Sequence, residues 1–382
     1  MSFVVLLGLL MGVGALSSTW IAGWFASDPT DRGASQNADQ RRIAARAFAA
    51  GDLHTAIEAA RLALAAQPDD TGALAVLARA LIYRSYADYD RAIDRDLALE
   101  VVTRAALRDP LDPDLQAVYA FTLAAVSQPA EAAEAAERVL NRHADNALAR
   151  TAQALAYGRV GAYEMARRES ERAVSDAAGY ANGTFLIDAL RALAIAQSDL
   201  GDYAGAGRTV EQAIALNDHI LLLYFEKALY ALQLGNTDAA TVAYFQVLAV
   251  DPENVKARLR LCETSSLLRE HEQAITYCTQ VTERAPAWAD GWYRLGREYF
   301  MVGAFEQARD HLRQCSSLQV MQAVPVADRR FECWYLQGQA AEILGDCVTL
   351  TATYNEYREM AATAQIDGVW AYPPGSLPAC DP

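Results

Sequence analysis

The chain has 382 residues, of which 53% are hydrophobic and 21% charged, which excludes a wholly disordered or low-complexity protein. Asp and Glu number 48 against 33 Lys and Arg, and the net charge of −15 makes a nucleic-acid backbone an unsuitable partner. The length fits two or three ordinary domains, or one elongated array of repeats.

The first segment, residues 1–27, contains no charged side chain and is almost continuously apolar. As a helix it would be longer than the about 30 Å hydrocarbon core of a bilayer. We therefore expect an uncleaved transmembrane anchor, with Trp20, Trp24 and Phe25 at one membrane interface. The alternative is a secretory signal cleaved at the small-residue site Ala15-Leu16-Ser17.

Two further features concern the contacts and the orientation of this predicted membrane helix. Gly8 and Gly12 form a small-residue stripe that would let another membrane helix approach closely, although Gly is also common in membrane helices generally. The cations that follow, from Arg32 onward, favour a cytoplasmic C-terminal domain, whereas the acidic flank with Asp28 and Asp31 favours the opposite orientation.

A linker is expected at residues 28–36, and a regular repeat follows it. Small residues recur at separations of 42, 34, 34, 40, 34, 34 and 34, which indicates a base period of 34 with insertions. These residues are Ala56, Ala98, Ala132, Ala166, Ala206, Ala240, Ala274 and Ala308. We expect each to lie where two helices of a hairpin cross, because a small side chain lets the backbones approach.

The clearest copy carries Trp292, Leu295, Gly296 and Tyr299 in the spacing W-x-x-L-G-x-x-Y, and Ala308 follows. In this it resembles the tetratricopeptide repeat (TPR) family. The resemblance implies an all-α fold, a right-handed α-solenoid of helix-turn-helix repeats over residues 37–364. The nine repeats are 37–70, 71–112, 113–146, 147–180, 187–220, 221–254, 255–288, 289–322 and 331–364. In the last copy Leu350 replaces the small Ala, which suggests a capping repeat.

The resemblance also implies a concave face, lined by the first helix of each repeat, that binds other proteins. Matching the first helices gives these partner-binding positions: Arg41, Phe48, Arg79, Ile82, Phe121, Leu155, Arg191, Ile195, Phe225, Leu229, Leu259, Glu263, Tyr293, Arg297 and Phe300. The Lys/Asn arrangement that clamps a C-terminal carboxylate in chaperone-binding relatives is absent. An apolar helix or extended segment is therefore the expected ligand. Ordinary packing of the concave face is the alternative for each residue.

An insertion in the second repeat places Tyr83, Tyr86 and Tyr89 three residues apart, either as a protruding contact surface or as part of longer helices that cover a neighbour. The tail, residues 365–382, contains Trp370 and Tyr372 and is expected to be extended. Its aromatic residues would cap the last helix or, alternatively, bind a ligand.

The six cysteines all lie in the last third of the chain, which is typical of disulfides in an oxidising compartment. The helix positions predict the pairs Cys262–Cys278, Cys315–Cys333 and Cys347–Cys380, with buried free thiols as the alternative. Disulfides would place the array in the periplasm or outside the cell.

The sequence contains no C-x-x-C, G-x-S-x-G, H-E-x-x-H or P-loop motif. The histidines are isolated from one another, and each is expected on the solvated surface: His54, His143, His219, His271 and His311. The acidic turn from Asp109 to Asp114 is interpreted as helix capping rather than a cation site. We therefore predict no catalytic, metal or cofactor site.

Only Lys227 and Lys256 are lysines, and this preference for Arg suggests a GC-rich bacterial genome. The leading hypothesis is a membrane-anchored scaffold for protein–protein interaction, an accessory or assembly subunit of a bacterial membrane complex. Two alternatives remain at this point: a secreted or periplasmic binding module released by signal cleavage, and a regulatory accessory of a separate enzyme.

Overall fold

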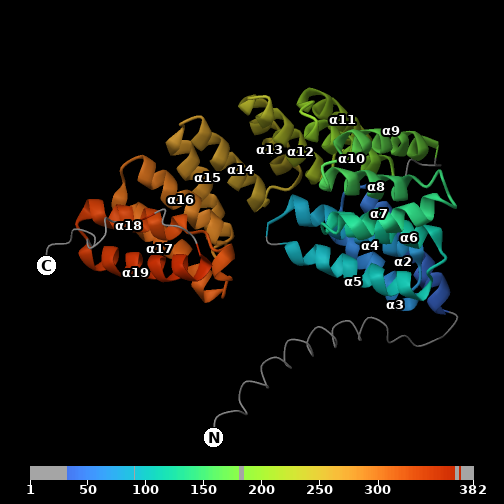
Figure 1. Cartoon of the computed structure of the whole chain (residues 1–382), viewed down its shortest axis with the longest axis horizontal. Coiled ribbons are helices and arrows are strands. Elements are labelled where there is room, and N and C mark those ends of the chain that lie inside the picture. The colour runs from blue at the N-terminus through green and yellow to red at the C-terminus, as the bar shows by residue number, and fades with distance from the viewer. Residues whose placement is uncertain (1–31, 90, 180–184, 366–369, 371–382) are drawn as a thin grey trace, which may run out of the picture. The chain divides into compact units, whose positions relative to one another are not determined.

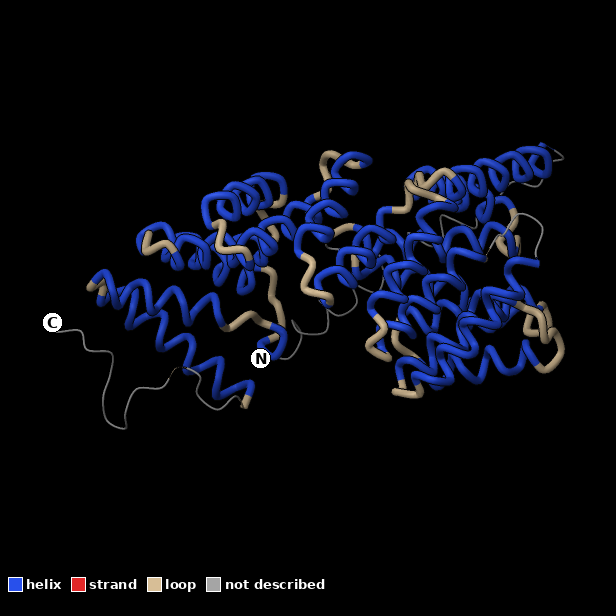
Figure 2. Tube along the Cα trace, turned by 90° about the horizontal axis from the view of Figure 1, so that it is seen from above, coloured by secondary structure: helices blue, strands red, loops and turns tan. Residues whose placement is uncertain are grey.

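The computed structural model describes residues 32–89, 91–179, 185–365 and 370. These residues form 18 α-helices and one short 3-10 helix, η2 (Val326–Asp328), and no strand occurs among them (Figures 1 and 2). The predicted all-α class is therefore confirmed. None of the described helices is both long and apolar enough to span a bilayer. The predicted anchor, with Gly8 and Gly12, lies outside the described residues.

The helices follow one another in pairs along the chain. The pairs are α2 (Arg32–Ala49) with α3 (Leu53–Ala66), α4 (Thr71–Ala87) with α5 (Ala92–Arg108), α6 (Pro113–Ala125) with α7 (Pro129–Leu140), α8 (Ala147–Arg159) with α9 (Tyr163–Gly179), α10 (Leu186–Asp199) with α11 (Tyr203–Leu216), α12 (Leu221–Gln233) with α13 (Thr237–Val250), α14 (Val255–Leu267) with α15 (His271–Arg284), α16 (Ala289–Met301) with α17 (Phe305–Met321), and α18 (Glu332–Leu344) with α19 (Cys347–Ala364). Six first helices begin at the first residue of a predicted repeat: α4, α6, α8, α12, α14 and α16.

The small residues that define the repeat are all buried. All eight alanines, from Ala56 to Ala308, are at most 1% exposed, so no space is left at these positions for a larger side chain. Leu350 takes the same place in the last pair and is also fully buried. The sequence period therefore marks helix crossings, as predicted.

Local capping explains where many helices begin. Asp52, Asp70, Asn146, Asn254 and Asp346 each accept a hydrogen bond from a backbone N–H three residues later, which satisfies a donor that the first turn leaves open. The acidic turn before α6 acts in the same way, since Asp112 accepts bonds from the amides of Asp114 and Leu115. Its interpretation as a cap is confirmed.

The chain divides into two compact units, unit 1 up to Asn236 and unit 2 from Thr237. In unit 1, aliphatic and alanine side chains of successive helices form one large core, with Leu81, Tyr83 and Phe121 fully or nearly fully buried. In unit 2, the largest core surrounds Trp334 and Tyr357. Within each unit, neighbouring pairs pack against one another, as stacked repeats require.

The end of unit 2 is covered by Trp370, which is 5% exposed. Its ring lies 5.0 Å from that of Tyr354 and 5.4 Å from that of Tyr357, measured between centroids. The indole rests on Gly338, where a β-carbon would collide with it. The interpretation of the tail aromatics as a cap is confirmed for Trp370, and Tyr372 lies outside the described residues.

Two histidines contradict the expectation of a solvated surface. The His311 ring is stacked between Trp292 and Tyr299, with centroid distances of 5.6 and 5.2 Å. His271 contacts Glu298, a carboxylate that is only 1% exposed. Both predictions failed because they considered neighbours along the chain, whereas these partners lie on other helices.

Candidate functional site

The inner helices of unit 1 enclose a buried charge network. Arg79 on α4 forms an ion pair with Asp188 on α10, and their side chains are 4% and 0% exposed. Tyr83, one helical turn from Arg79, donates its hydroxyl to Asp188 Oδ1 at 2.5 Å. Burial, followed by the negative charge of Asp188, raises the pKa of Tyr83 well above its usual range, so the phenol stays protonated and can donate.

A second ion pair continues the network to α12. The Arg191 guanidinium donates to Glu226, with Nη2–Oε1 at 2.6 Å and Nε–Oε2 at 3.1 Å. Burial opposes the charge on Arg191, but the Glu226 carboxylate outweighs it, and the pKa of Arg191 is raised. Arg191 also lies 4.8 Å above the ring of Tyr83, and this cation–π contact joins the two ion pairs.

The first two repeats meet the fifth and sixth at the same place. Asn217 Nδ2, in the turn between α11 and α12, donates to the backbone oxygen of Ala49 at 2.8 Å, across 168 residues of sequence. Gly51 lies so close to His219 that a β-carbon there would collide with it. In addition, α4 contacts α12. The inner helices of unit 1 therefore meet across the interior instead of lining an open groove.

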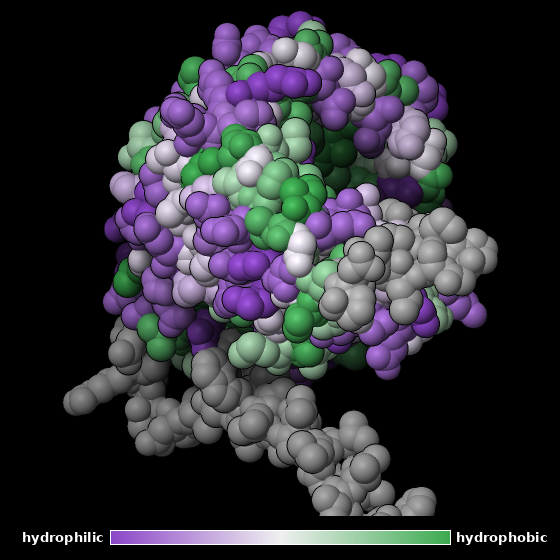
Figure 3. All heavy atoms as spheres, turned by 90° about the vertical axis from the view of Figure 1, so that its left-hand side faces the viewer, coloured by the Kyte–Doolittle hydropathy of each residue, from purple (hydrophilic) through white to green (hydrophobic). Residues whose placement is uncertain are grey.

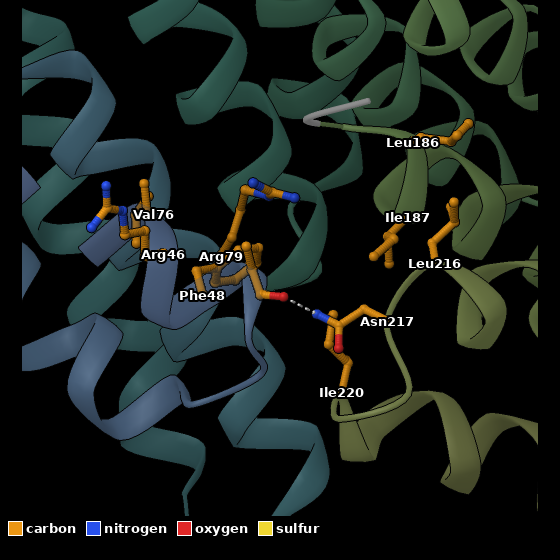
Figure 4. Close-up of a pocket in the computed structure, with 11 residues that line it drawn as sticks. Arg46, Phe48, Val76, Arg79, Leu186, Ile187, Leu216, Asn217 and Ile220 are labelled. Atoms are coloured by element: carbon orange, nitrogen blue, oxygen red, sulfur yellow. Dashed lines mark hydrogen bonds between the residues drawn. The ribbon is translucent and has the colours of Figure 1, made fainter. Parts of the chain in front are cut away.

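A cleft remains beside this contact (Figure 4). It has a volume of about 460 Å³, within the range of small-molecule pockets. Phe48 and Arg79 stand on one wall and Ile187 and Ile220 on the other, as Figure 4 shows. The complete lining is Ala45, Arg46, Phe48, Ala49, Val76, Arg79, Leu186, Ile187, Leu216, Asn217 and Ile220. The Arg79 guanidinium is paired with Asp188 and lies 4.4 Å from the centroid of the Phe48 ring. Arg79 therefore forms part of the cleft wall as one member of an ion pair.

A second hollow, of about 420 Å³, lies between the α8–α9 pair and α10. It is lined by Ala154, Leu155, Gly158, Arg159, Tyr163, Ala166, Ala192, Ile195, Ala196 and Asp199. Leu155 and Ile195, both predicted to bind a partner, face it together. Burial raises the pKa of Asp199, and the nearby Arg159 lowers it in part. The lining of the hollow thus combines aliphatic and alanine side chains with the charged residues Arg159 and Asp199.

The predicted partner-binding residues fall into two groups. Seven are buried: Phe48, Arg79, Ile82, Phe121, Arg191, Leu259 and Tyr293. Six are half-buried and two are exposed: Leu155, Ile195, Phe225, Glu263, Arg297 and Phe300, then Arg41 and Leu229. The burial of the first group matches the alternative of ordinary packing of the concave face, and binding of a partner stays a prediction for these positions. In unit 1 these side chains pack across the interior, and in unit 2 Tyr293 is covered by Arg330, 4.6 Å above its ring.

Sequence reasoning did not identify the acidic members of the network. Asp188 and Glu226 were absent from the predicted positions, although each is an isolated acid within an apolar first helix. A buried acid needs a buried hydrogen-bonding or charged partner, so an acid within an apolar helix was the sequence signal for the network. Glu298 was also absent from the predicted positions; it accepts a bond from Ser266 Oγ at 2.5 Å and contacts His271 Nδ1 at 2.9 Å.

Unit 2 contains the predicted disulfides. Cys262 bonds to Cys278 within the α14–α15 pair, and Cys315 bonds to Cys333 between α17 and α18. Their Cα atoms are 5.4 and 5.9 Å apart, inside the usual range. Cys347 is also disulfide-bonded, and its predicted partner Cys380 lies outside the described residues. Among the described residues, no group of three His, Cys, Asp or Glu side chains could hold a metal ion.

Comparisons with known proteins agree with this fold. The profile of the family described as Tetratricopeptide repeat matches residues 231–293. No curated protein is significantly similar in sequence. The crystal structure of the APC/C hetero-tetramer Cut9–Hcn1 aligns with 77% of this chain at 16% identity and a TM-score of 0.51, and the alignment spans only 54% of that chain. The C-terminal part of a TPR repeat-containing protein from Cytophaga hutchinsonii aligns with 65% of this chain and 96% of its own, at 16% identity and a TM-score of 0.51.

Proposed function

We propose that this tetratricopeptide-repeat protein is a membrane-anchored scaffold, which holds another protein at the outer side of a bacterial membrane as an accessory or assembly subunit. Stacked helix pairs present surfaces to protein partners in the family whose profile matches residues 231–293. The repeat array provides the protein-interaction scaffold, and the proposal adds that this scaffold is anchored in a membrane and belongs to a complex.

The observation that carries the scaffold role is the hollow beside Leu155 and Ile195. Its volume of about 420 Å³ can receive an apolar side chain from a partner, while Arg159 and Asp199 offer charged contacts beside it. Both aliphatic residues are half-buried, so they can contact a partner without leaving the core. An apolar helix laid against α8 and α10 is the expected ligand.

The disulfides support the proposed location of the array outside the cytoplasm. Cytosolic reductants keep thiols free, so Cys262–Cys278 and Cys315–Cys333 favour a periplasmic or extracellular array. Residues 1–27 supply an uncharged segment of bilayer length, and this supports anchoring. The amino terminus would then lie in the cytoplasm, as the acidic flank of the segment favours.

Photo-crosslinking in native membranes tests the scaffold role. A diazirine amino acid replaces Ile195, and a matched probe replaces Ile93, which is 70% exposed on the outer helix α5. We expect one discrete protein adduct at position 195 and none of that mass at position 93. Equal adducts at both positions, or none at either, would remove the hollow as a partner site.

The anchor has a separate test. Alkaline carbonate should leave the full chain in the membrane pellet, and intact mass spectrometry should detect residues 1–17. Loss of those residues, with the chain in the soluble fraction, would instead support the released periplasmic module.

A further inference from the structure

Three successive turns of unit 2 carry exposed aliphatic side chains. They join α14 to α15, α16 to α17 and α18 to α19, at the end of each first helix. The exposed fractions are 68% for Leu267, 41% for Leu268, 55% for Met301, 47% for Val302, 55% for Ile343, 37% for Leu344 and 83% for Val348. We call these seven residues the turn strip.

The fold places the turn strip along one edge of unit 2. The first helices α14, α16 and α18 lie side by side, since α16 contacts both of the others. Each is followed by an antiparallel partner, so the three run in the same direction and end at the same edge. Figure 3 shows that hydrophobic residues lie among hydrophilic ones on one face of the molecule.

The repeat does not require this pattern. In unit 1 three of the corresponding turns pair one aliphatic residue with a polar one: Arg159-Val160, Asp199-Leu200 and Gln233-Leu234. The first of these two positions at the helix end can therefore be occupied by a polar residue. In unit 2 both positions are apolar in all three turns, which marks the edge as a contact surface.

The chemistry of the turn strip suits hydrocarbon better than a protein surface. Its members are Leu, Ile, Val and Met, without the Trp, Tyr and Arg that anchor most protein interfaces. The side chains protrude at the ends of hairpins, and turn ends along one edge can meet a plane together. The acid nearest Val348, Asp346, is held by Arg309 at 3.0 Å and caps α19.

Electrostatics adds little to this contact. Arg269 and Glu270, both exposed beside Leu268, offset one another, and the whole chain carries a net charge of −15. Attraction to anionic headgroups is therefore not the source of affinity, and the contact should depend little on salt. Apolar burial remains as the driving force.

We propose that the turn strip rests unit 2 on the lipid bilayer, with its aliphatic side chains inserted at the interface. The inference rests on the proposed membrane anchoring, because residues 1–27 would keep a bilayer permanently within reach. A tethered surface acts at high effective concentration, so a contact too weak for a free protein is sufficient here.

A matched pair of probes tests the proposal in the full chain. A diazirine amino acid replaces Met301 in the turn strip or Met321, which is 79% exposed at the opposite end of α17. The chain is reconstituted in vesicles of phosphatidylcholine and phosphatidylglycerol, irradiated and mapped by mass spectrometry. We expect lipid adducts several-fold more abundant at position 301 than at 321, with little change on addition of salt.

A second variant asks whether the turn strip acts as a unit. With the probe at Ile343, the changes Leu267→Ser and Val348→Ser should strongly reduce its lipid adducts. Both side chains are mainly exposed, so the core should be unaffected. Unchanged adducts would contradict a shared contact.

The outcomes separate this inference from the anchor. If alkaline carbonate leaves the chain in the vesicles while position 301 shows no lipid excess over 321, the turn strip does not bind the bilayer although the anchor stands. If carbonate releases a chain that does show the excess, the anchor fails and the turn strip acts as a peripheral contact. Protein adducts in place of lipid adducts at 301, in native membranes, would overturn the bilayer as the occupant.

Discussion

The two units are built from the same helix pairs but are held together by different chemistry. Unit 1 contains no cysteine and encloses the paired charges Arg79–Asp188 and Arg191–Glu226. Unit 2 has two described disulfides, and Trp370 covers one end. The comparison teaches that the same repeat can be completed in two ways, by charge pairs between helices far apart in sequence in unit 1 and by bonds and ring contacts between neighbouring helices in unit 2.

The largest effect is expected from breaking the charge network. Asp188→Ala would leave Arg79 buried without its carboxylate and Tyr83 without its acceptor, which should destabilise unit 1 by about 3–5 kcal/mol. Native-state hydrogen exchange resolved by peptide should show faster exchange throughout unit 1 and unchanged protection in unit 2. The triple variant Arg79→Met, Tyr83→Phe, Asp188→Leu is the control, and it should recover most of the loss because no unpaired polar group remains.

Removing a disulfide should destabilise unit 2 and leave unit 1 unchanged. Cys315→Ala with Cys333→Ala opens a link between residues 18 apart in sequence, and closure of a loop of this size contributes about 2–4 kcal/mol. Faster exchange should be confined to unit 2. Matching losses in unit 1 would show that the two units unfold together.

A feature common to both units should respond equally in each. Ala206→Leu in unit 1 and Ala274→Leu in unit 2 both overfill a helix crossing where the native alanine is 0% exposed. Each should lower the free energy of unfolding by about 1–3 kcal/mol, measured by urea denaturation. Melting like that of the wild type for either variant would mean that the repeat register is misassigned there.

The smallest expected effect is a pH dependence confined to unit 2. Burial between two aromatic rings lowers the pKa of His311 below its usual 6.5, and neighbouring Asp310 offsets this only in part. The unfolded chain then binds the proton more tightly, so stability is fully present above about pH 6.5 and declines as the pH falls through that value. His311→Phe keeps the stacking and should remove this contribution from the pH profile of unfolding.

The sequence was sufficient for everything that depends on the repeat itself. The spacing of the alanines located the helix crossings, and the helix positions of Cys262, Cys278, Cys315 and Cys333 identified two disulfides. These features arise from neighbouring helices, so local pattern and helix geometry determine them.

The remaining features depend on the sum of small rotations between repeats. Asp188 meets Tyr83 across 105 residues. No local pattern carries this information, so the charge network of unit 1 was not predicted. The stacking of His311 on Trp292 and Tyr299 lies within one helix pair, and it escaped prediction because only neighbours along the chain were considered.

The bond between Asn217 and Ala49 has a consequence for how unit 1 folds. An open repeat array contains only neighbour contacts, so it can unzip from either end and grow one repeat at a time. A link across 168 residues gives unit 1 a contact that forms only after the fifth repeat has left the ribosome or the export channel. Such a link raises the mean sequence separation of contacts, which slows folding, and it couples the first repeat to the fifth. Unit 1 should therefore fold and unfold in a single cooperative step, without the fraying ends of an open solenoid.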